Sequence, residues 1–191
     1  MRKITLIRSI IFLSLSVCLF LTLASNQAHC ADIATVTKLN TVLRDGPSED
    51  GEKVLLLKKK AVLALVDREN IDGWLNVIHI QTGKEGWIKA KHVSLALSKQ
   101  PSRPPVFNEQ KIDEYSNPEI EIENASDKDL LLKVGQERFE IQKHTTKSVS
   151  ILPSDYKYHA SAPGVFPAIG KKDFLTGYRY TWKFWIETRS R

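Results

Sequence analysis

Apolar residues in the first half of the chain come in short runs instead of at helical spacing. The runs at 54–57, 61–66 and 74–80 are separated by stretches rich in Gly, Asp, Asn and Pro, such as Asp45-Gly-Pro and Thr82-Gly-Lys. Short β-type runs at close spacing with such turns between them are typical of an all-β barrel or sandwich. We find no helical periodicity of useful length in either half of the chain.

The second half shows the period of two that is expected for strands with one buried face. Residues 119–123 alternate strictly between Glu and Ile, so one face is apolar and the other acidic. Residues 130–134 and 138–142 flank Gly135-Gln, which predicts a tight hairpin. Further strand-like runs follow at 147–152, at 156–162 and around Phe174.

The strongest strand pattern in the chain covers residues 178–186. Its alternation puts one set of side chains on a single face, where we expect a core: Tyr178, Tyr180, Trp182, Phe184 and Ile186. Trp185 falls on the opposite face, where it is either a partner-binding residue or is covered by a neighbouring element. Six or seven strands in about 75 residues predict an immunoglobulin-like antiparallel β-sandwich over 118–191.

Two Gly-Trp pairs, Gly73-Trp74 and Gly86-Trp87, lie one hairpin apart and follow the segment Arg44-Asp-Gly-Pro-Ser. This order resembles that of bacterial SH3-like (SH3b) domains over residues 33–97, about a third of the chain. The resemblance implies an SH3-like barrel whose ligand surface lies near the first loop and the strand of the second Trp. It makes Arg44, Asp45, Trp74 and Trp87 candidate ligand-binding residues. From the residues alone, both Trp rings equally fit framework packing.

Residues 1–31 have the pattern of a targeting segment. Three basic residues come first: Arg2, Lys3 and Arg8. The apolar run that follows at 9–24 is short for a bilayer span, which needs roughly 20 residues. Small residues follow, which fits a signal helix that is cleaved near residue 31, and hence a periplasmic or secreted protein. The alternative is an uncleaved anchor, the only case in which we expect a membrane partner.

The predicted organisation has four parts. A signal peptide at 1–31 is followed by the SH3-like domain at 32–97, a proline-containing linker or extended lead-in at 98–117, and the sandwich at 118–191. The net charge is +6, and three of these charges lie on residues 2, 3 and 8, ahead of the first acid at position 32, so the rest carries +3. That balance is too mild to indicate a nucleic-acid partner. The densest basic run, 58–60, is typical of a solvated turn.

The sequence shows no combination of residues that is typical of a catalytic site. Both cysteines, Cys18 and Cys30, lie in the targeting segment, so a chain that is cleaved after Cys30 or Ala31 has no thiol nucleophile. The histidines beyond it show no metal-ligand spacing, and no phosphate or dinucleotide motif occurs. We therefore expect no enzyme activity, no metal and no cofactor. The histidines are His79, His92, His144 and His159.

Binding is the function that the sequence favours. The first hypothesis is a non-catalytic module of the cell envelope that recognises peptidoglycan or another extended peptide through its SH3-like domain. The second is a protein-interaction or scaffold subunit of an envelope complex, with Trp185 in the partner contact. An enzyme of another type is the third.

Overall fold

The computed structural model describes residues 32–96, 107–114 and 116–184, and within these ranges the chain is all-β, as predicted. One turn of 3-10 helix, η1 (Ala90–His92), is the exception to the strand pattern there. Trp185 and Ile186 lie outside the described residues. In the described part, no helix is long and apolar enough to cross a bilayer.

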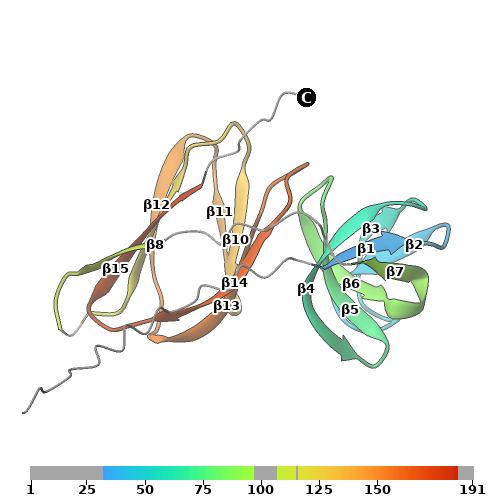
Figure 1. Cartoon of the computed structure of the whole chain (residues 1–191), viewed down its shortest axis with the longest axis horizontal. Coiled ribbons are helices and arrows are strands. Elements are labelled where there is room, and N and C mark those ends of the chain that lie inside the picture. The colour runs from blue at the N-terminus through green and yellow to red at the C-terminus, as the bar shows by residue number, and fades with distance from the viewer. Residues whose placement is uncertain (1–31, 97–106, 115, 185–191) are drawn as a thin grey trace, which may run out of the picture.

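The first seven strands form one sheet around a compact apolar core (Figure 1). Its order is β3-β2-β6-β5-β4-β1-β7, so neighbours in the sheet are mostly not neighbours in the chain. The strands are β1 (Ile33–Val36), β2 (Thr41–Arg44), β3 (Lys53–Leu57), β4 (Val62–Ile71), β5 (Trp74–His79), β6 (Lys84–Lys89) and β7 (Val93–Ala96). The three predicted apolar runs correspond to β3, β4 and β5. Leu43, Leu63, Leu75 and Ile88 are buried in the core.

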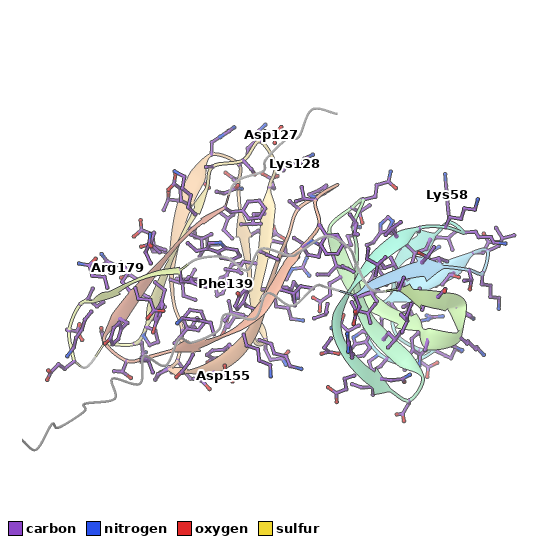
Figure 2. The ribbon with its side chains drawn as sticks, in the orientation of Figure 1. Lys58, Asp127, Lys128, Phe139, Asp155 and Arg179 are labelled. Carbon is purple, nitrogen blue, oxygen red and sulfur yellow. The ribbon has the colours of Figure 1, made fainter. Side chains whose placement is uncertain are left out.

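The predicted closed barrel does not form, because β3 and β7 remain edge strands of this sheet. Three of the four β7 residues are exposed, and β3 begins with an exposed lysine, Lys53. Exposed, short and charged edges are typical of strands that do not pair further. The predicted solvated turn at 58–60 follows β3, and Lys58 projects from its end of the sheet (Figure 2).

Strands β2 and β6 approach each other closely at Gly86. A Cβ on Gly86 would lie 2.6 Å from the carbonyl oxygen of Arg44 and 2.7 Å from Leu43 Cγ. Both distances are too short for any side chain, so only glycine permits this approach. The approach places Arg44 directly opposite Trp87 in the ladder.

The remaining strands form two four-stranded sheets that pack as a sandwich, with orders β11-β10-β13-β14 and β12-β9-β15-β8. The two sheets face each other (Figure 1), and side chains from both share one core. The strands are β8 (Phe107–Lys111), β9 (Glu119–Asn124), β10 (Leu130–Val134), β11 (Glu137–Ile141), β12 (Thr145–Ser150), β13 (Ser154–Ser161), β14 (Ala168–Phe174) and β15 (Tyr178–Phe184).

Two features of the sandwich differ from a wholly antiparallel unit that begins at 118. Strand β15 runs parallel to β9, because it inserts between β8 and β9 after the chain has passed through the other sheet. Strand β8 lies within the stretch 98–117 and pairs with β15. The reason is Phe107, whose ring packs at 5.4–5.8 Å from those of Tyr158, Phe174 and Trp182.

The alternation predicted for the last strand is confirmed. Tyr180, Trp182 and Phe184 are buried, and Tyr178 packs against the same core. The other face of β15 carries cations that meet the acidic face of β9. Arg179 Nη2 lies 2.8 Å from Glu119, and the lysine at 183 lies 2.6 Å from the carboxylate at 123. Figure 2 shows Arg179 on the side of the sandwich away from the seven-stranded sheet.

The two groups of strands are in direct contact through the turn that joins β5 to β6. The Ser161 hydroxyl donates to the Gly83 carbonyl oxygen at 3.0 Å, and the Gly164 N–H donates to the Ile80 carbonyl oxygen at 2.8 Å. A Cβ on Gly83 would lie 3.2 Å from the backbone of Ala162. The turn therefore packs backbone to backbone against the end of β13.

Glu85 anchors this contact electrostatically. Its side chain is 11% exposed, and it accepts hydrogen bonds from Lys133 at 3.0 Å and from the Asn76 amide at 3.0 Å. The buried His159 places Nε2 at 3.4 Å from Glu85 Oε2, which is long for a hydrogen bond. Burial alone would raise the pKa of Glu85, but His159, Asn76 and Lys133 lower it to about 2.

We expect Gly86→Ala to destabilise the fold by about 1–3 kcal/mol, because the new Cβ must push β2 away from β6. Gly46→Ala is the matched control, since a Cβ there meets nothing within 4 Å. Urea unfolding monitored by Trp fluorescence measures both. Equal midpoints for the two variants would contradict the close approach of β2 and β6.

We expect Glu85→Gln to lower the free energy of unfolding at neutral pH by on the order of 2–3 kcal/mol. The pKa of Glu85 is lower in the folded state, so its contribution is present above its ordinary pKa of about 4.5 and is lost as the pH falls toward 2. Denaturation at a series of pH values should show the two proteins converging over that range. Glu69→Gln, at an exposed position of β4, should stay within about 0.5 kcal/mol of the parent. A difference independent of pH would refute the assignment.

Candidate functional site

A small basic pocket opens on the seven-stranded sheet. It encloses about 270 Å³, and its wall carries four cationic side chains, Lys38, Arg44, Lys89 and Lys91. Glu49 is the one carboxylate among the lining residues. The rest of the wall is formed by His92, Trp74, Asn40, Thr41 and Val42. We call this site the basic pocket.

Strands β5 and β6 supply the floor of the pocket. Trp74 and Lys89 are direct partners in the antiparallel ladder, and the Lys89 ammonium lies 5.4 Å from the Trp74 ring centroid, which is a cation–π contact. Leu75 and Val77 of β5 belong to the core, so Trp74 falls on the opposite face of the strand. Trp74 is nevertheless only 6% exposed, and the Lys89 ammonium lies over its ring.

The loop before β2 and the turn η1 supply one side of the pocket. The Thr37 N–H and hydroxyl both donate to the His92 carbonyl oxygen, at 2.9 and 3.0 Å, which ties the loop to η1. The Thr41 hydroxyl donates to the Lys38 carbonyl oxygen at 2.9 Å, and Asn40 has a φ of 53°, which asparagine tolerates better than most residues. These bonds fix a tight loop that holds Lys38 near His92.

The turn between β2 and β3 supplies the opposite side. The Ser48 hydroxyl accepts from the N–H groups of Asp50 and Gly51, both at 3.1 Å. Arg44 Nη1 donates to the Gly51 carbonyl oxygen at 2.6 Å, so the guanidinium both shapes the turn and faces the pocket. Glu49, at the tip of this turn, contacts Lys89 and lies 3.8 Å from Arg44 Nη2.

Like charges oppose each other in the basic pocket. Burial lowers the pKa of Lys89, and the nearby charges of Lys91, Lys38 and Arg44 lower it further. Burial also lowers the pKa of His92, again with contributions from the neighbouring lysines. The site therefore presents excess positive charge, which is the electrostatic character of an anion-binding site.

The structure brings together two of the candidate residues that the sequence suggested, Arg44 and Trp74. Trp87 is half-buried opposite Arg44 on β6 but does not line the pocket, and Asp45 is exposed on the loop beyond β2. Trp185 lies outside the described residues.

Sequence reasoning missed most of the cations in the pocket. Lys89, Lys91 and His92 follow the second Gly-Trp pair within a few residues, so the basic run 89–92 was a visible signal. Its significance depends on Lys38, which lies about fifty positions earlier in the chain. Within the described ranges, no three His, Cys, Asp or Glu side chains are close enough together to hold a metal ion.

No protein-family model matches this chain, and neither a curated protein nor a solved structure matches it.

We expect Lys38→Gln to raise the pKa of His92, because Lys38 makes the largest charge contribution after burial to its lowering. An NMR titration of the His92 ring protons measures this directly, and the shift should shrink at high salt. Lys84→Gln, at an exposed position of β6 outside the pocket, removes the same charge and should leave the His92 titration unchanged. An identical response to both variants would show that Lys38 does not face His92.

Proposed function

We propose that this chain is a non-catalytic binding module of the cell envelope. The basic pocket of its SH3-like unit, residues 32–97, would hold peptidoglycan or another extended peptide. Export would depend on the signal helix at 1–31, and the immunoglobulin-like sandwich would act as the rigid support of the binding unit.

The observation that carries the proposal is the convergence of Arg44 and Trp74 in one pocket with three further cations. The resemblance to bacterial SH3-like domains implies a ligand-binding role for both residues. Peptidoglycan stem peptides and other extended peptides carry free carboxylates, which arginine and lysine bind through charge-assisted hydrogen bonds. An adjacent aromatic ring adds an apolar surface for the neighbouring part of the chain.

A binding role also fits the chemistry of the pocket. All of its titratable groups except Glu49 are basic, and the pKa values of Lys89 and His92 are lowered. Glu49 lies at the surface, with a side chain that is 62% exposed. A general acid and base would require a buried pair whose pKa values are driven apart. The pocket is also small for an apolar ligand, and its polar wall suits one charged group.

We expect the purified chain to cosediment with isolated peptidoglycan sacculi and to lose most of this retention in Arg44→Gln or Lys89→Gln. Each substitution removes a charge-assisted hydrogen bond worth about 1.5–3 kcal/mol, which corresponds to roughly tenfold or more in affinity. Lys84→Gln is the control for total charge and should be retained like the parent chain. Absence of retention for the parent chain, or equal retention of all four proteins, would argue against the proposal.

A further inference from the structure

The cations of the basic pocket are only partly neutralised by the chain itself. Four cationic side chains face one carboxylate, that of Glu49. Lys38 and Lys91 are exposed residues that flank His92, whereas Arg44 and Lys89 contact Glu49 from either side. The Glu49 carboxylate therefore bridges two cations of the pocket. The other two, Lys38 and Lys91, have no contact with this carboxylate.

The bridging carboxylate belongs to an exposed side chain whose nearer partner is Lys89. The side chain of Glu49 is 62% exposed, and its separation of 3.8 Å from Arg44 Nη2 is too long for a hydrogen bond. Exposed ion pairs of this kind contribute little to stability, because water and salt screen them and two long side chains lose freedom. The turn that carries Glu49 keeps its shape through Ser48 and the bond from Arg44 to Gly51, neither of which uses the Glu49 side chain. Glu49 can therefore leave its position without disturbing the turn.

We propose that the basic pocket binds a carboxylate of its peptide ligand, and that Glu49 occupies the position of this carboxylate until the ligand displaces it. The inference deepens the proposed function and depends on it for the kind of ligand. Displacement exchanges one carboxylate for another between Arg44 and Lys89, so the pair of cations is never left without a partner. The ligand gains in addition the attraction of Lys38 and Lys91, which Glu49 does not contact.

The geometry favours a carboxylate over a larger anion. The position between Arg44 and Lys89 is already filled by a carboxylate of the chain, and Trp74 lies under Lys89 as an apolar floor. A free carboxylate with a small substituent would place its charge between the two cations, beside the Lys89 ammonium that lies over the Trp74 ring. N-acetylalanine is the simplest probe with these features, its amide lacks only the charge, and inorganic phosphate represents the other common anion.

The test is an NMR titration of the full chain that follows the Trp74 indole N–H and the backbone amide of Lys89. We expect saturable shifts with N-acetylalanine and none with its amide, and weaker binding of phosphate. Glu49→Gln should tighten the Kd for N-acetylalanine by roughly two- to fivefold, because it removes a competing exposed ion pair. Glu69→Gln changes the net charge equally at an exposed position of β4 and should leave the Kd unchanged. Lys91→Gln should weaken the binding of N-acetylalanine. Because this substitution leaves the hydrogen bond from Arg44 to the turn in place, it tests the charge of the pocket without altering the turn.

Three outcomes would overturn the inference: equal binding of N-acetylalanine and its amide, equal effects of Glu49→Gln and Glu69→Gln, or binding of phosphate without binding of N-acetylalanine. The sacculus experiment separates this inference from the proposed function. Retention on sacculi without carboxylate binding would overturn the inference alone. Carboxylate binding without retention on sacculi would support the site and refute peptidoglycan as the ligand.

Discussion

The antiparallel pairing of β5 with β6 is the constraint on which both the candidate site and the contact between the two β units depend. At its open end, the pair Trp74–Lys89 forms the floor of the basic pocket. At its closed end, the turn packs on the end of β13, and Glu85 meets Lys133 and His159 of the sandwich. Residues 85, 87 and 89 are two apart on β6, so they share the face away from the core. One face of a single hairpin therefore carries both features.

Local pattern was sufficient to predict most of the strands. Apolar runs in the first half and strict alternation at 119–123 and 178–184 correspond to β-strands, because burial of one face imposes a period of two. The open edges of the first sheet and the parallel pairing of β15 with β9 could not be read from the sequence. Both depend on which strands meet, and pairing between distant segments leaves no mark on either strand alone.

The site was predictable only in part, for the same reason. Arg44 and Trp74 emerged from a motif order that resembles a known family, whereas Lys38 and Glu49 become meaningful only when loops from separate segments converge. The proximity of Glu85 to His159 could not be predicted for the same reason. One residue lies in the first sheet and the other in the sandwich, and nothing in the sequence links the two positions. Composition had suggested only a mild positive charge, yet its local distribution is strongly uneven.

The position of β15 has a consequence for how the chain acquires its structure during synthesis. Strands β8 and β9 do not pair with each other, and β15 lies between them. Until residues 178–184 leave the ribosome, that sheet lacks the strand between β8 and β9, and the rings of Tyr180, Trp182 and Phe184 are missing from the core of the sandwich. The first seven strands have no such dependence, since all of them precede residue 97. Translation therefore releases the complete seven-stranded sheet well before the sandwich can close, and the late segment is the one whose premature termination would expose apolar surface.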